Sequence, residues 1–269
     1  TTTSLDAVPS QLDVGGAAVA IVMAGNGYAV VAPDYIGLGV SREPHPYLVA
    51  DDAARAVVDM IAAARRIDGV PRERLFLSGF SQGGQATIAA LRVLEASGET
   101  VLGAAPVAGP YNIRHVSLAA ALRGGARQQS RYLAYMAWGY TAHYGRPLES
   151  VLTPATAKIV KDLFTSPHEP EEFIAALPAN PRKMFDAAFL DAFDKDKPHW
   201  LLDAFAENNV SDWAPRAPVR LYYGSADADV VPAEALGAER SMRARGADVR
   251  AVNVGAVEHD PSMLAAAPM

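Results

Sequence analysis

The chain has 269 residues, of which 50% are hydrophobic and 20% charged, and its formal net charge is -6. This composition is typical of a globular protein and excludes a disordered or fibrous chain. The acidic balance leaves no basic footprint for nucleic acid, and the longest apolar stretch, 15–24, is too short to span a bilayer. Because cysteine is absent, disulfides and thiol catalysis are excluded. We therefore expect a small-molecule partner, no nucleic acid and no membrane span.

Helix-like and strand-like segments alternate along the chain, a pattern typical of a parallel sheet with helices on both faces. Apolar runs predict five strands, at 28–32, 75–77, 101–107, 219–223 and 249–254. Helical patterns lie at 15–25, 51–66, 82–96 and 233–245. In such a sheet, functional residues are expected at the ends of the strands.

The pattern changes between Tyr111 and Pro218, where helix-like segments are interrupted by prolines and no strand alternation appears. A structureless connection of this length would be unusual, so we interpret residues 111–218 as a helical cap insertion. The predicted domains are an α/β core, residues 1–110 and 219–269, and this cap.

The strongest motif is Gly79-Phe80-Ser81-Gln82-Gly83, a G-x-S-x-G sequence placed directly after an apolar strand and before a helix. A sharp strand-to-helix turn of this kind holds a serine hydroxyl exposed, and its glycines let neighbouring backbone approach. The same turn would aim the N–H of Gln82 and the positive end of the following helix at a developing oxyanion. A chance pentapeptide in a glycine-rich turn is the alternative, and it fits the strand-helix setting less well. We predict Ser81 as a nucleophile.

A serine needs a histidine to accept its proton and a carboxylate to orient that histidine, in the chain order serine, acid, histidine. Of six histidines, only His259 follows the last predicted strand. Asp227 and Asp229 both follow the penultimate strand, and either could be the acid. Asp227 is preferred because it comes first after the turn at Gly224, whereas Asp229 could simply hydrogen-bond the loop.

Together these features resemble bacterial carboxylesterases and lipases of the α/β-hydrolase superfamily, in particular the branch related to the secretory lipases. The resemblance rests on the stretches 27–41, 45–48, 79–84, 212–215 and 222–227, and on the terminal histidine. It implies an α/β-hydrolase fold and hydrolysis of a small-molecule ester, with no cofactor and no metal.

Members of this superfamily have further strands before the segment at 28–32, and a His-Gly segment there supplies a second oxyanion donor. The stretch from Thr1 to Ser4 looks like the residues that follow such a His-Gly. We therefore expect Thr1 to lie near the oxyanion hole with Gln82. We also expect the chain to be the downstream part of a longer precursor, whose upstream strands are disordered, removed, or retained as a separate fragment that supplies them. The resemblance and this processed-looking start favour a secreted or periplasmic protein.

Two features of the cap region could concern the substrate. Tyr135 and Trp138 belong to a dense aromatic patch at partly helical spacing, and Tyr111 follows the third strand, so all three could line a substrate pocket. Core contacts between cap and sheet are the favoured explanation of the aromatic patch, whereas a simple turn after a strand explains Tyr111 equally well. The acidic stretch 186–196 has no histidine pair at ligand spacing and is interpreted as a solvated face rather than a metal site.

The sequence thus predicts a serine esterase or lipase that works through an acyl-serine intermediate. A serine peptidase or amidase could use the same three residues, because the preference for a leaving group lies in the pocket. An inactive binding module of the same fold is a further alternative, although a complete serine, acid and histidine set disfavours it.

Overall fold

The structure, a computed structural model, describes residues 14–124, 127–165, 168 and 170–267. Its described residues form two compact units. The first, here called the sheet unit, comprises residues 14–35, 50–112 and 209–267. The second, here called the helical unit, comprises residues 36–49 and 113–208. The sheet unit therefore contains Ser81, Asp227 and His259.

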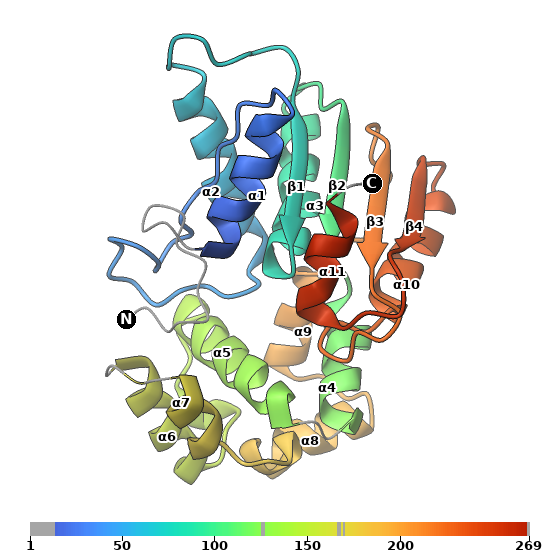
Figure 1. Cartoon of the computed structure of the whole chain (residues 1–269). Coiled ribbons are helices and arrows are strands. Elements are labelled where there is room, and N and C mark those ends of the chain that lie inside the picture. The colour runs from blue at the N-terminus through green and yellow to red at the C-terminus, as the bar shows by residue number, and fades with distance from the viewer. Residues whose placement is uncertain (1–13, 125–126, 166–167, 169, 268–269) are drawn as a thin grey trace. The chain divides into compact units, whose positions relative to one another are not determined.

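The sheet unit is built on four parallel strands in the order β1-β2-β3-β4. Their bounds are β1 Phe76–Phe80, β2 Gly103–Val107, β3 Val219–Tyr223 and β4 Val249–Asn253. Because the strands are parallel, their carboxyl ends meet at one edge of the sheet (Figure 1). Phe80 is in register with Val107 at this edge, and Tyr223 with Asn253.

Five helices belong to the sheet unit: α1 Val14–Gly25, α2 Ala50–Ala64, α3 Gln82–Ala96, α10 Ala233–Arg243 and α11 His259–Ala266. Helix α3 packs against β1, β2 and α2, and α10 packs against β3 and β4. Helix α11 packs against β2 and β3 and lies in front of the sheet in Figure 1, whereas α3 lies behind it. The prediction of a parallel sheet with helices on both faces is confirmed.

The core of the sheet unit forms where the apolar faces of the strands meet these helices. Leu77, Val219 and Leu221 from the strands are buried with Ile88 and Leu91 from α3. A fully buried leucine or isoleucine side chain stabilises a fold by about 2 kcal/mol relative to an exposed one. This rigid layer supports the loops at the carboxyl edge of the sheet.

The helical unit contains six helices among its described residues. They are α4 Leu118–Gly124, α5 Arg127–His143, α6 Pro154–Thr165, α7 Pro170–Ala176, α8 Ala187–Asp194 and α9 Trp200–Glu207. A π-helical turn, Ile113–Ser117, precedes α4, and two 3-10 turns lie at Leu148–Ser150 and Pro181–Met184. Helices α4, α6 and α7 pack on α5, and the apolar core of the unit contains Tyr140, Phe173 and Phe205.

Side-chain caps explain where two of these helices begin. The Asp186 carboxylate accepts the N–H of Phe189 at 2.7 Å at the start of α8. The His199 imidazole accepts the N–H of Leu201 at 3.2 Å at the start of α9. Such caps satisfy N–H groups that have no partner inside the helix.

The predicted strand at 28–32 is wrong, because this segment makes no strand in the structure. Its apolar pattern suits a buried strand, but a strand also needs a ladder of backbone hydrogen bonds to a neighbour. Val30 and Val31 are 40% and 41% exposed, and the ring of Tyr28 meets Phe76 of β1 edge to face at 6.0 Å. The segment therefore contacts β1 through side chains, while the sheet has four strands rather than five.

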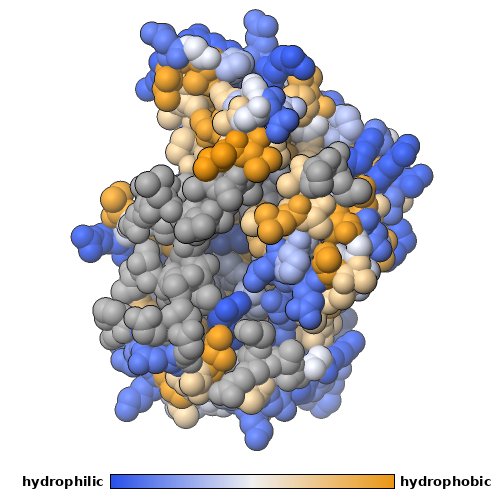
Figure 2. Space-filling model, in the orientation of Figure 1, coloured by the Kyte–Doolittle hydropathy of each residue, from blue (hydrophilic) through white to orange (hydrophobic). Residues whose placement is uncertain are grey.

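The visible surface mixes hydrophilic areas with smaller apolar ones (Figure 2). Across the described residues, every helix is too short or too polar to cross a membrane.

Candidate active site

Ser81 lies in the turn between β1 and α3, and its backbone has an unusual conformation. Its φ is 55° and its ψ is -117°, a positive φ that residues other than glycine adopt rarely. The N–H of Ser81 donates to the carbonyl of Val107 at 2.9 Å, and its own carbonyl accepts the N–H of Gly84 at 2.8 Å. The end of β2 and the first turn of α3 therefore hold the serine in this sharp bend.

Two of the nearby glycines are required by close backbone contacts. A Cβ on Gly79 would lie 2.3 Å from the carbonyl oxygen of Gly83, and one on Gly84 would lie 2.8 Å from Cα of Gly109. A Cβ on Gly83 would meet nothing closer than the Tyr35 hydroxyl at 3.9 Å. The tight approach therefore depends on Gly79 and Gly84.

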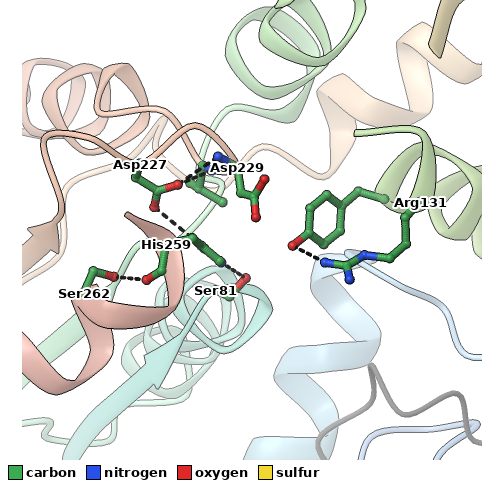
Figure 3. Close-up of polar contacts among 8 residues, drawn as sticks. Ser81, Arg131, Asp227, Asp229, His259 and Ser262 are labelled. Atoms are coloured by element: carbon green, nitrogen blue, oxygen red, sulfur yellow. Dashed lines mark hydrogen bonds and ion pairs between the residues drawn. The ribbon is translucent and has the colours of Figure 1, made fainter. Parts of the chain in front are cut away.

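His259 is the first residue of α11 and presents its imidazole to the serine (Figure 3). Its Nε2 lies 2.8 Å from Oγ of Ser81, and its Nδ1 lies 2.8 Å from Oδ2 of Asp227. Ser262 donates its hydroxyl to the carbonyl of His259 at 2.6 Å, within the first turn of the helix. With Asp227 ionised, Nδ1 carries the proton and Nε2 is the acceptor facing the serine hydroxyl.

Asp227 is the aspartate that faces the imidazole, and its second oxygen is also occupied. Oδ1 accepts the backbone N–H groups of Asp229 and Val230 at 2.9 and 2.8 Å. The side chain of Asp227 is 0% exposed and that of His259 is 7% exposed. Asp229 thus contributes a backbone donor to the aspartate, in line with the hydrogen-bonding role considered for this loop.

The loops that carry the aspartate and the histidine are also tied to each other. Ser225 donates its N–H to the carbonyl of Gly255 at 2.9 Å, and Ala226 donates to that of Val257 at 3.2 Å. A Cβ on Gly224 would lie 2.3 Å from the Val257 carbonyl oxygen. These backbone contacts hold the two loops at a fixed distance, independently of the hydrogen bond between the Asp227 and His259 side chains.

Of the two predicted oxyanion donors, Gln82 lies within the described residues. Gln82 is the first residue of α3, so its N–H belongs to the first turn, where backbone N–H groups carry partial positive charge. Thr1 lies outside the described residues.

Tyr111 and Tyr135 are buried in the cores of their units, and Trp138 is partly buried against the core of the helical unit. Tyr111 is fully buried in the sheet unit, and this burial raises the pKa of its hydroxyl. Tyr135 stacks on Tyr47 with ring centroids 4.5 Å apart, and Trp138 stacks on Phe164 at 5.4 Å, both within the helical unit. The proposal that any of the three contacts a substrate stays a prediction.

Two residues with roles at this edge of the sheet were missed by the sequence analysis. Phe80 places its ring against the imidazole of His259, with centroids 4.7 Å apart. Glu234, in the first turn of α10, accepts the N–H groups of Tyr111 and Asn112 at 2.8 and 2.7 Å. Phe80 occupies a variable position of the G-x-S-x-G motif. Glu234 belongs to no motif, so the only sequence signal for Glu234 was its place on an otherwise apolar helix face.

The described residues contain no group of histidine, aspartate or glutamate side chains that could hold a metal ion. The acidic stretch 186–196 is instead engaged in surface ion pairs. Arg182 binds Asp194 at 2.6 Å, and Lys197 binds Asp191 at 2.7 Å. A hydrogen bond from Arg182 lowers the pKa of Asp194.

Comparison with known proteins places the chain among hydrolases. The structure of a Legionella pneumophila protein assigned as a hydrolase superposes with a TM-score of 0.90 and 25% identity, over 100% of this chain and 75% of that one. LipA of Xanthomonas oryzae, a rice cell wall degrading esterase, superposes with a TM-score of 0.72 and 25% identity, over 87% of this chain and 67% of that one.

Lipase A of Candida antarctica in its closed state shares the fold at a TM-score of 0.63 and 17% identity, over 92% of this chain and 60% of the lipase. No curated protein matches the chain in sequence. The sequence profile of the alpha/beta hydrolase family matches residues 16–267, nearly the whole chain. The chain therefore belongs to the alpha/beta hydrolase family, as its resemblance to esterases and lipases led us to expect.

Proposed function

We propose that this protein is a serine esterase in which Ser81 is the nucleophile, His259 the general base and Asp227 the residue that orients the base. The observation that carries the proposal is the continuous hydrogen-bonded path from Ser81 Oγ through the imidazole to the buried carboxylate, with both links at 2.8 Å. Each side chain performs a step that ester hydrolysis requires.

In the first half of the reaction, His259 Nε2 takes the proton of Ser81 while Oγ attacks the ester carbonyl carbon. The negative charge that develops on the carbonyl oxygen is stabilised by the N–H of Gln82. We propose that a second donor comes from the region of Thr1. His259 then returns its proton to the leaving alcohol, and the acyl group remains on Ser81.

In the second half, water replaces the alcohol. His259 takes a proton from water, the resulting hydroxide attacks the acyl carbon, and the proton passes to Oγ as the acid leaves. Asp227 stays ionised throughout and stabilises the imidazolium. Its two backbone hydrogen bonds leave Oδ2 directed at Nδ1.

The choice of esters as the substrate class rests on the similar proteins. LipA of Xanthomonas oryzae is an esterase at 25% identity, and lipase A of Candida antarctica shares the fold. Peptide bonds could be attacked by the same three side chains, so the test must compare both leaving groups.

The direct test is hydrolysis of p-nitrophenyl esters of graded acyl length beside aminoacyl p-nitroanilides, with Ser81→Ala as the control variant. We expect ester turnover that the substitution abolishes and little or no anilide cleavage. A fluorophosphonate probe should add to wild-type protein at Ser81 and leave Ser81→Ala unmodified. An enzyme that neither reacts with the probe nor turns over an ester, while folded, would contradict the proposal.

A further inference from the structure

The aromatic ring of Phe80 rests against the imidazole of His259. The two ring centroids are 4.7 Å apart and the planes are inclined by 35°. Phe80 is the last residue of β1 and directly precedes Ser81. One short segment therefore carries both the serine that faces Nε2 and a ring that contacts the imidazole.

The ring of Phe80 is itself held in place by apolar packing. It packs on a small cluster of buried residues formed by Val107, Ala108 and Ala266, together with Tyr222 and Val254. Val107 and Ala108 lie at the end of β2, whereas Ala266 lies at the end of α11. Phe80 thus packs on a cluster to which both β2 and α11 contribute residues.

This contact restrains a motion that the two hydrogen bonds do not. Asp227 and Ser81 engage the nitrogens of the imidazole in the plane of the ring. Bonds at two points leave the plane free to tilt about the line that joins them. An aromatic ring against the imidazole limits that tilt and keeps Nε2 aligned with the serine hydroxyl.

The contact also acts electrostatically when the imidazole becomes charged. The face of a phenylalanine ring attracts a cation within about 6 Å of its centroid, by about 0.5–1 kcal/mol or more where water is excluded. The N-terminal end of α11 opposes a positive charge at its first residue. Asp227 is the charged side chain bonded to the imidazole. Glu258 and Asp260, on either side of His259, are exposed. Tyr222 packs on the same apolar cluster as Phe80.

We propose that Phe80 is a positioning residue for the base, which fixes the tilt of the His259 imidazole and stabilises its protonated form. This inference rests on the proposed function of the site and deepens it. It assigns a role to the variable residue between Gly79 and Ser81 in the G-x-S-x-G turn.

The test is the pH dependence of ester hydrolysis by Phe80→Leu. Loss of the ring destabilises the imidazolium, so the imidazole should stay neutral to lower pH. The acid limb of kcat/KM should therefore move down by about half a pH unit. We also expect kcat to fall about tenfold while KM changes less than twofold. Phe80→Tyr should restore the pH profile because it keeps the aromatic face.

The matched control is Phe76→Leu, at the other end of the same strand, where the side chain is 46% exposed. It should leave the acid limb unchanged. If Phe80→Leu does not fold, Phe80→Met serves instead, since methionine fills irregular space. An acid limb that stays in place in the folded Phe80 variant, or that moves equally in Phe76→Leu, overturns the inference.

A second measurement separates this inference from the proposed function. The imidazole of His259 can be titrated by NMR without any substrate, with its signal assigned by comparison with His259→Gln. A lower pKa for His259 in the Phe80 variant than in wild type supports the contact even if no ester is cleaved. An unchanged pKa in an active enzyme refutes it while the esterase proposal stands.

Discussion

Gly79 and Gly83 approach so closely that a Cβ on Gly79 would stand 2.3 Å from the carbonyl oxygen of Gly83. The serine between them has a positive φ, so the strand must end and the helix begin within one residue. The shape of this bend is therefore set by contact between two segments of backbone.

The first prediction concerns Gly79→Ala. The added methyl group forces β1 and α3 apart, and we expect the free energy of unfolding to fall by about 3 kcal/mol, the upper end of the usual cost of overpacking. Gly83→Ala is the matched control, because its Cβ would meet nothing closer than 3.9 Å. Urea unfolding of both variants measures the difference, and equal stabilities would contradict the role given to Gly79.

The second prediction concerns Asp227→Asn. The amide oxygen can still accept the N–H groups of Asp229 and Val230, so the fold should persist. Its NH2 group would face Nδ1 and favour the tautomer that leaves no acceptor at Nε2, so we expect kcat on an ester to fall by about 10⁴-fold at neutral pH. Steady-state kinetics with Asp229→Asn as the control checks this, since that change leaves the backbone donor intact. A similar loss in both variants would argue against Asp227 as the orienting acid.

The third prediction concerns Glu234, which is 2% exposed and bonds two consecutive backbone N–H groups after β2. Glu234→Ala leaves the N–H groups of Tyr111 and Asn112 without this acceptor, and we expect a loss of about 3 kcal/mol in the free energy of unfolding. Glu234→Gln keeps one acceptor oxygen and should lose less than half as much. Thermal and urea unfolding report the free energy of unfolding of both variants. An alanine variant as stable as wild type would show that the two hydrogen bonds of Glu234 are unimportant for stability.

The fourth prediction concerns pH and the cap at the start of α9. Burial lowers the pKa of His199 from its ordinary value of 6.5, and its neutral Nδ1 accepts the N–H of Leu201. Because the folded pKa lies below the unfolded one, this stabilisation is complete above about pH 6.5 and is lost as the pH falls from there towards the folded pKa.

In His199→Asn the cap no longer titrates. The difference in unfolding free energy between wild type and this variant should therefore shift in favour of the variant between pH 7.5 and pH 5. Urea unfolding at several pH values measures it. Other titrating groups are common to both proteins and cancel in the difference, so a constant difference would show that the cap does not titrate.

The motif and the chain order allowed most of the candidate site to be predicted. A strand, a G-x-S-x-G turn and a helix are local features, and the carboxyl ends of parallel strands meet at one edge, so Ser81, Asp227 and His259 could be expected together. The preference for Asp227 over Asp229 followed from its position after Gly224. The structure places Asp227 at the imidazole and gives Asp229 a backbone contact.

What could not be predicted depends on contacts between distant residues. The segment 28–32 has the composition of a buried strand, but composition does not show whether a neighbour completes the ladder. Glu234 accepts a hydrogen bond from Tyr111, 123 positions away, and the ring of Phe80 contacts His259, near the C-terminus. No local pattern encodes such pairs, so they became visible only in the folded structure.

Ser81 and His259 are separated by 178 positions, and they follow the first and the last strand of the sheet. Closing so long a stretch of chain costs entropy before any contact forms, and contacts of this range slow folding. During refolding, labelling of Ser81 by an active-site probe should therefore recover only after β4 has docked. The rate at which the Ser81 hydroxyl regains reactivity would then report the rate at which the whole sheet unit assembles.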